Sequence, residues 1–184
     1  KILFLHGTKK IIMETISISS DGLNVLKFIN QTNHSIFLTG KAGTGKTTLL
    51  RQIISTTHKN TVVVAPTGIA ALNAGGVTIH SMFQLAPGSF VPDPSYIPDH
   101  NNGVKIDSIA SLSKTFKMSG TKQAVIRALD LLVIDEVSML RADLLDAMDF
   151  VMRRVRRKEQ PFGGVQVLFI GDLLQRLPVV KNEE

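Results

Sequence analysis

The chain has 184 residues, of which 43% are hydrophobic and 20% are charged, proportions typical of one soluble globular domain with a sizeable core. It contains no cysteine, which excludes disulfides, thiolate metal sites and cysteine nucleophiles and fits a reducing cytoplasm. No apolar run approaches the ~18 residues that a membrane span needs, so no membrane partner is expected. The net charge of +6 is compatible with nucleic acid binding, but it is equally compatible with an ordinary solvated basic surface.

The first residues of the chain differ from the rest. Position 1 is lysine, and Met13 is a plausible natural start. The apolar run 3–5 is too short for the core of a signal peptide. We therefore expect residues 1–19 to be an N-terminal extension that is partly extraneous to function, and residues 20–184 to form one domain.

The hydrophobic pattern then alternates between helical and strand periods. In chain order, the expected elements are a helix at 23–29, a strand at 36–39, a helix at 48–54, a strand at 61–65, a short helix at 69–73, an extended piece at 77–80, a loop at 84–108, a helix at 121–129, a strand at 131–135, an amphipathic helix at 138–158 and a strand at 165–170. This alternation predicts an α/β fold with a doubly wound, mostly parallel sheet and helices on both faces. Ligands are then expected at the carboxyl ends of the strands.

A glycine-rich loop follows the first expected strand. Residues 40–47 read G-x-x-x-x-G-K-T between a strand and a helix, which is the P-loop in the context that it requires. Its backbone N–H groups and the start of the next helix would surround a phosphate chain. The expected nucleotide-binding residues are Gly40, Ala42, Gly43, Thr44, Gly45, Lys46, Thr47 and Thr48. Lys46 would reach the β- and γ-phosphates, and the Thr47 hydroxyl would bind Mg²⁺.

Two acidic residues follow the third expected strand. Asp135 at a strand end is the Walker B arrangement, so it would hold Mg²⁺, and Glu136 would activate the attacking water. The alternative is that this pair caps the helix that follows. Beyond the fourth expected strand, Gln175 would contact the γ-phosphate or the attacking water, or else lie in solvent.

Small polar side chains lie beyond the second expected strand. Thr67, Thr78, His80 and Ser81 lie in loops rich in small polar groups, and hydroxyls, backbone N–H groups and a helix N-terminus are the parts that hold a sugar–phosphate backbone. From residue type alone, helix capping and a structural histidine are the better interpretation. The basic run 153–158 lies at the end of a long helix, where it complements the helix dipole; direct DNA contact by this run is the alternative.

Together and in this order, the motifs resemble those of superfamily-one DNA helicases of the five-prime-to-three-prime branch. The matching segments are 37–48 (motif I), 65–71 (motif Ia), 78–81 (the motif after it), 133–139 (motif II) and 171–175 (motif III). The helix 138–157 followed by 161–166 is similar to the signature that separates the Pif (petite-integration-frequency) helicases from RecD-type relatives. The resemblance covers about residues 36–180.

This resemblance implies a P-loop NTPase of the RecA-like type, a three-layer αβα sandwich, as the first of two such domains. It implies ATP as fuel, Mg²⁺ as cofactor and single-stranded DNA as the track. It makes Thr67, Thr78 and His80 contacts to DNA, and Gln175 the sensor of the γ-phosphate. The family resemblance also implies roles in DNA repair and telomere maintenance, and a cytoplasmic, nucleoid-associated location in a bacterium.

Three departures from the family pattern accompany the resemblance. Arg176 enters motif III where the family has Leu-Pro-Pro, no glutamine before the P-loop clearly matches the adenine-reading one, and no second RecA-like domain follows motif III. We therefore expect the isolated chain to bind nucleotide weakly and to hydrolyse it poorly. The alternatives are a RecD-like motor and a non-enzymatic remnant that only binds nucleotide or a partner.

Overall fold

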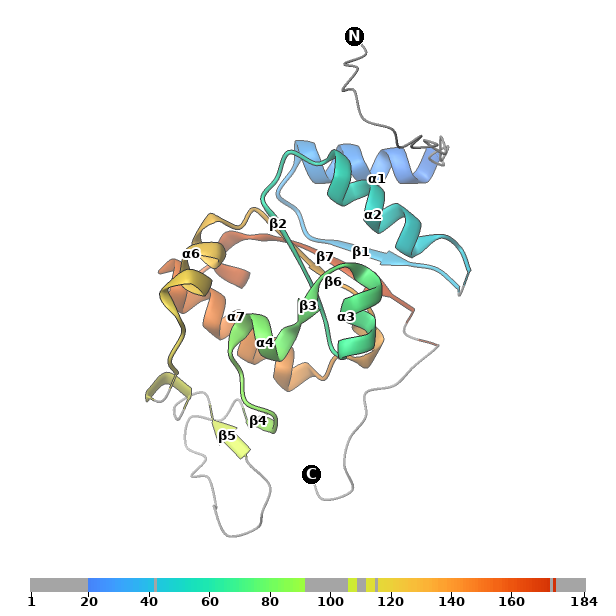
Figure 1. The fold of residues 1–184 in the computed structure, drawn as a ribbon. Helices are drawn as coiled ribbons and strands as arrows, with labels where there is room; N and C mark the ends of the chain where they lie inside the picture. Colours follow the sequence, from blue (N-terminus) through green and yellow to red (C-terminus); the bar gives the residue numbers. More distant parts are fainter. Residues whose placement is uncertain are drawn as a thin grey trace, which may run out of the picture.

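A five-stranded parallel sheet forms the centre of the molecule. The computed structural model describes residues 20–41, 43–91, 106–108, 112–114, 116–172 and 174. The strands are β1 (Ile36–Thr39), β2 (Thr61–Ala65), β3 (Val77–Thr78), β6 (Leu131–Ile134) and β7 (Gln166–Gly171). They lie in the order β1-β7-β6-β2-β3, and every neighbouring pair is parallel (Figure 1). The predicted α/β class with a parallel sheet is confirmed.

Helices cover both faces of this sheet. One apolar cluster joins the strands to α1 (Ser20–Gln31), α2 (Lys46–Thr56) and α3 (Gly68–Ala74). The other joins them to α4 (Ile79–Phe83), α6 (Gly120–Ala128) and α7 (Ala142–Arg156). In β6, Leu131 and Val133 belong to the first cluster while Leu132 and Ile134 belong to the second. A strand buried on both faces reads as an unbroken apolar run, which is why the sequence indicated it clearly.

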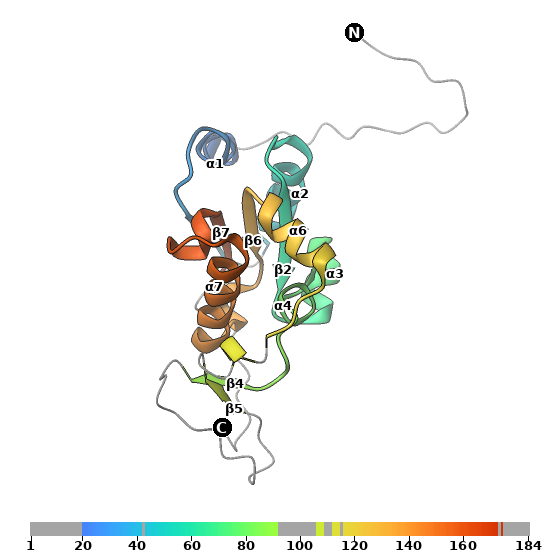
Figure 2. The same cartoon turned by 90° about the vertical axis from the view of Figure 1, so that its left-hand side faces the viewer.

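Two segments after β2 differ from the sequence expectation. Residues 79–80, expected to be extended, begin α4, because the Thr78 side chain caps a helix by accepting a hydrogen bond from the Ser81 N–H at 3.2 Å. The stretch 84–108, expected to be irregular, contains the short strands β4 (Ser89–Val91) and β5 (Ile106–Ser108), which pair in parallel. Both views show this pair at the end of the molecule opposite α1 (Figures 1 and 2). Strands of three residues are too short to produce a readable period.

The long helix expected from Ser138 begins later, at Ala142. A short 3₁₀ turn, η2 (Val137–Met139), comes first and packs against the end of β7. A Cβ atom at Gly171 would lie 2.9 Å from Val137 Cγ1 and 3.0 Å from Val137 N. Only glycine fits at that strand end, so the chain after the acidic pair turns tightly around it before α7 can start. At its other end, α7 packs against a second 3₁₀ segment, η3 (Pro161–Gly164).

Candidate functional site

The P-loop connects β1 to α2 at the carboxyl edge of the sheet. Gly43 and Gly45 have φ angles of 79° and 82°, a region that L side chains rarely adopt. Gly45 is the N-cap of α2 and has no side chain to cap it. The Thr44 hydroxyl instead donates to the Lys41 carbonyl at 2.8 Å. The first turn of α2 contains no acidic residue, so its free N–H groups face no competing negative charge from within that turn.

Lys46 lies folded across this loop. Its ammonium group donates to the carbonyl oxygen of Gly40 and, at 2.9 Å, to that of Lys41. Carbonyl oxygens are weaker acceptors than phosphate oxygens, so a phosphate chain would replace these two carbonyls as acceptors for the Lys46 ammonium group. Thr47 and Thr48 follow in the exposed first turn of α2. Ala42 lies outside the described residues.

The acidic pair follows β6, two strands away from β1 in the sheet. The Asp135 N–H donates to the Val64 carbonyl at 2.9 Å, which continues the β2–β6 ladder. One carboxylate oxygen of Asp135 accepts from the Glu136 N–H at 2.9 Å. Burial raises the pKa of Asp135, and the Glu136 N–H and the charge of Lys46 counter this in part.

The capping interpretation of this pair is not what the structure shows. Glu136 is the N-cap residue of η2, but its side chain makes no capping hydrogen bond, and the N-cap of α7 is Arg141. Glu136 instead has a φ of 52°, in the left-handed region that is costly for a non-glycine residue. Strained backbone is common where a side chain must be aimed for function.

The donor groups at this edge fit a magnesium ion. Mg²⁺ takes oxygen ligands and usually binds through one or two carboxylates, substrate phosphates and water. Asp135 and Thr47 offer such oxygens, and a partly buried carboxylate with a raised pKa would be stabilised as its anion by a cation. Within the described part of the chain, no group of three or more His, Asp or Glu residues could hold a metal ion by itself.

The end of β7 lies between the P-loop and the acidic pair. Gly171 is in register with Thr39 of β1, and Phe169 is in register with Ile134 of β6. The chain leaving β7 at Asp172 therefore emerges at the same edge as the two motifs. Gln175, the expected γ-phosphate sensor, and Arg176 lie outside the described residues.

The candidate DNA contacts lie at the same carboxyl edge of the sheet, but near β2 and β3, away from β1 and the P-loop. Thr78 ends β3, in register with Ala65 of β2, so it lies near Thr67 along the carboxyl edge. Thr67 and Thr78 are N-caps, accepting from the N–H groups of Ala70 and Ser81 at 3.2 Å each. Because each hydroxyl accepts in its cap, its own hydrogen can still be donated to a phosphate oxygen. The capping interpretation is thus realised without excluding the DNA one.

His80 follows within α4 and is half-buried. Burial lowers its pKa, which favours the neutral form of the imidazole. Neutral imidazole can donate one hydrogen bond to a phosphate oxygen but brings no charge to it. DNA contact by His80 therefore remains a prediction based on position rather than on electrostatics.

The basic run at the end of α7 is largely used within the fold. Arg153 forms an ion pair with Asp149 at 2.7 Å, one helical turn earlier. Arg154 donates to Ser113 at 2.9 Å, and Arg156 donates to carbonyls at the end of α6. These contacts favour a structural role, in agreement with the dipole interpretation, over direct DNA contact.

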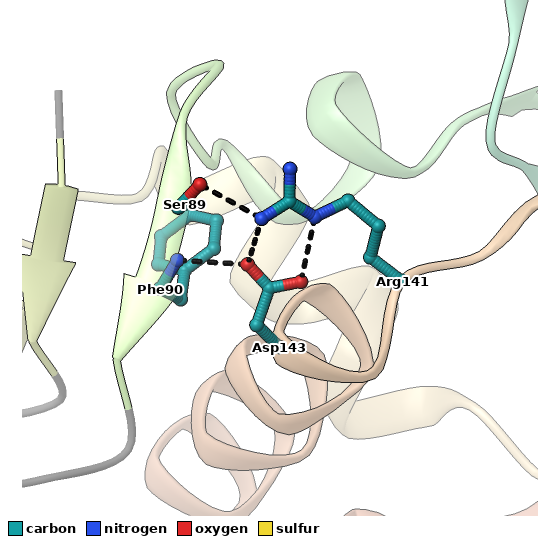
Figure 3. Close-up of polar contacts among 4 residues, drawn as sticks. All are labelled: Ser89, Phe90, Arg141 and Asp143. Carbon is teal, nitrogen blue, oxygen red and sulfur yellow. Dashed lines mark hydrogen bonds and ion pairs between the residues drawn. The ribbon is translucent and has the colours of Figure 1, made fainter. Parts of the chain in front are cut away.

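One polar cluster gave no signal in the sequence. Arg141 and Asp143, at the start of α7, form a bidentate pair with both N···O distances at 3.0 Å. Arg141 also donates to the Ser89 hydroxyl at 2.7 Å, and Asp143 accepts from the Phe90 N–H at 2.9 Å (Figure 3). The cluster fastens β4 to the start of α7, the helix that follows the acidic pair.

Known proteins similar to this chain are PIF1-type helicases. The PIF1-like helicase family matches residues 17–91 and 99–184. The ATP-dependent DNA helicase PIF1 of Saccharomyces cerevisiae is 37% identical over 172 residues, which are 91% of this chain and 18% of that protein. The human ATP-dependent DNA helicase PIF1 is 37% identical over 151 residues, 82% of this chain and 21% of that protein.

The structural comparison agrees. Pif1 helicase from Bacteroides, in complex with ADP-AlF3 and single-stranded DNA, matches with a TM-score of 0.76 and 39% identity, over 92% of this chain and 35% of that one. The expected RecA-like architecture is confirmed by this likeness. The chain thus spans about a fifth of these curated relatives and about a third of the solved helicase. Among the described residues, no helix is both long and apolar enough to span a bilayer.

Proposed function

Because the chain belongs to the PIF1-like helicase family, we propose that it is the first RecA-like domain of an ATP-dependent DNA helicase that moves five-prime to three-prime along single-stranded DNA. One observation carries this proposal: the P-loop after β1 and the acidic pair after β6 lie at the carboxyl edge of one parallel sheet, on either side of the end of β7. The relatives are named ATP-dependent DNA helicases, and their greater length supports a second RecA-like domain of the same parent protein as the partner that completes the nucleotide cleft.

The residues at this edge divide the work of ATP hydrolysis. Lys46 would leave the carbonyls of Gly40 and Lys41 and place its charge on the β- and γ-phosphates. The N–H groups of the P-loop and of the first turn of α2 would bind the remaining phosphate oxygens. Glu136 would accept the proton of the attacking water as general base. Gln175 would contact the γ-phosphate, as the resemblance implies.

Thr47 and Asp135 would hold the magnesium ion. Bound there, Mg²⁺ would neutralise charge on the β- and γ-phosphates. Asp135 must be ionised for this, and its raised pKa means that the cation and the proton compete for the same carboxylate. The likeness to a helicase solved with ADP-AlF3 supports nucleotide binding at this place.

Single-stranded DNA would run along the β2–β3 side of the same edge. Thr67, Thr78 and His80 would contact phosphate and sugar, with little preference for base sequence. A Bacteroides relative was solved with single-stranded DNA bound, which supports this partner. The matched relatives are named PIF1 helicases, which favours a Pif-type motor over a RecD-like one.

The test of the nucleotide site is a titration of a fluorescent ATP analogue with Mg²⁺. Lys46→Ala removes charge-assisted hydrogen bonds, so we expect affinity to fall about 10- to 100-fold. Lys41→Ala is the matched control, because Lys41 contributes its backbone carbonyl to this loop and its exposed side chain can be removed. Equal affinity of the unaltered protein and Lys46→Ala for the analogue would refute the nucleotide site. If the parent protein bound nucleotide but never hydrolysed it, the chain would be part of a non-enzymatic remnant.

Polarity and strand separation need the parent protein. We expect it to unwind a duplex with a five-prime tail and to leave one with a three-prime tail intact. The chain of 184 residues should by itself show negligible DNA-stimulated hydrolysis and no strand separation, because hydrolysis of this kind takes place between two domains. Unwinding by the isolated chain would refute that division of labour.

A further inference from the structure

The short turn that follows Asp135 contains two unfavourable features. Glu136 lies in the left-handed region, with a φ of 52°. Two residues later, Ser138 is only 6% exposed, and its Oγ has no hydrogen-bond partner in the described part of the protein. Buried hydroxyls nearly always have a partner, because an unpaired one loses its bonds to water without replacement. Two such features in one turn indicate that the observed conformation of this turn is energetically unfavourable.

The turn lies between the nucleotide motifs and the end of β7. On one side, the turn follows Asp135, whose N–H donates to the Val64 carbonyl at 2.9 Å. On the other, Gly171 lies so close that a Cβ atom there would be 3.3 Å from Ser138 N. The next residue, Asp172, is half-buried, and its Oδ1 accepts a hydrogen bond from Leu174 N–H at 3.1 Å. Asp172 therefore brings a carboxylate, a strong acceptor, to the segment that adjoins the turn.

We propose that Ser138 is a positioning residue for the nucleotide reaction, an inference that rests on the proposed function. When a nucleotide with Mg²⁺ occupies the P-loop, the partners of Lys46 and Asp135 change, and the turn that Asp135 precedes moves with them. The Ser138 hydroxyl then donates to the Asp172 carboxylate. This bond holds the turn, and with it the backbone that aims Glu136 at the attacking water.

The effect of removing the Ser138 hydroxyl on stability therefore has opposite signs without and with bound nucleotide. Without nucleotide, the hydroxyl of Ser138 is a burden, so its removal stabilises the protein. With nucleotide, the same hydroxyl is bonded, so its removal weakens the bound state. A ligand can shift such an equilibrium only by its different affinity for the two states, and Ser138 is one of the groups that creates this difference.

The experiment compares Ser138→Ala with the unaltered protein by thermal unfolding, with and without a non-hydrolysable ATP analogue and Mg²⁺. We expect Ser138→Ala to raise the melting temperature of the nucleotide-free protein by ~2–4 °C and to bind the analogue about tenfold more weakly. Ser55→Ala is the matched control. Its exposed hydroxyl donates to the Gln52 carbonyl at 3.0 Å within α2, so its loss should affect both states alike.

A double-mutant cycle tests the partner. If Ser138 and Asp172 bond in the bound state, then the double variant Ser138→Ala, Asp172→Ala should bind the analogue about as weakly as either single variant. Additive losses in affinity would overturn this pairing. Equal shifts of melting temperature by Ser138→Ala in both states would overturn the positioning role. A lack of any response of the unaltered protein to the analogue would instead refute the proposed function itself.

Discussion

Arg156 is the residue of the basic run whose removal should cost the most stability. Its guanidinium donates to the carbonyl oxygens of Ile126 at 2.7 Å and of Arg127, Leu129 and Gly163 at 2.9 Å each. Three of these carbonyls lie at the C-terminal end of α6, where helical carbonyls have few partners within their own helix; that of Ile126 also accepts from the Leu129 N–H at 3.4 Å. Arg156 therefore fastens the end of α6 and the η3 segment to the end of α7.

The expected loss follows from these four contacts, three of which share the two hydrogens of the Arg156 Nη1 atom. A bond to a charged group contributes about 1.5–3 kcal/mol, but bonds that share one partly exposed side chain are not additive, because water can replace some of them. We expect Arg156→Ala to lower the free energy of unfolding by about 3 kcal/mol. For a chain of this size, that corresponds to a melting temperature lower by roughly 6–12 °C.

The assay is urea unfolding followed by circular dichroism, and the control is Arg157→Gly. That variant removes the same charge from the next position, where Arg157 has a φ of 56° that favours glycine at a helix end. Its free energy of unfolding should stay within about 0.5 kcal/mol of that of the unaltered protein, because relief of the left-handed backbone offsets the greater conformational freedom that glycine loses on folding. Equal destabilisation by the two variants would show that loss of positive charge near the helix dipole, and not the carbonyl contacts, sets the effect.

Three further predictions concern the proposed site. Glu136→Gln in the parent protein should keep nucleotide affinity but lower the hydrolysis rate about 10²–10⁴-fold; an unchanged rate in a steady-state ATPase assay would exclude Glu136 as the base. Because burial raises the pKa of Asp135 in the folded protein, its ionised form costs stability above the unfolded-state pKa. Asp135→Asn should therefore raise the melting temperature at pH 7, a gain that disappears as the pH falls below the unfolded-state pKa, and pH-independent stabilisation in a thermal scan would contradict this. Thr67→Asp keeps a good N-cap but repels phosphate, so fluorescence anisotropy should show weaker binding of unrelated single strands. The control Ser119→Asp, at the cap of α6, should bind these strands as the unaltered protein does. Equal binding by the two variants would place the DNA contacts elsewhere.

The sequence predicted the parts of the fold whose signals are local. The strand around Leu132 was readable because it is buried on both faces and therefore uninterrupted by polar residues. The P-loop was readable because glycine spacing, Lys46 and the flanking strand and helix all lie within a few positions of one another. The same holds for Asp135, which directly follows its strand.

The rest depends on contacts between segments that are distant in the sequence. Nothing near Val137 indicates that η2 must turn around Gly171, so the start of α7 was placed too early. The Arg141–Asp143 pair gave no signal, because its partners in β4 precede it by about fifty residues. The unpartnered hydroxyl of Ser138 was likewise unreadable, since burial of a serine is decided by what packs over it.

The order of the strands also has a consequence for how the chain folds during its synthesis. β1, at the edge of the sheet, pairs with β7, so Ile36 can pair with Leu168 only after Leu168 has been synthesised. At about 5–20 residues per second, that delay is on the order of ten seconds. β2 and β3 can pair early, but β1 joins the same sheet as β2 only after β6 and β7 have been made and inserted between them. The apolar residues of β1 stay exposed to chaperones and to other nascent chains during that interval. The phosphate-binding loop is therefore translated early but acquires its strand pairing only when β7 has emerged from the ribosome.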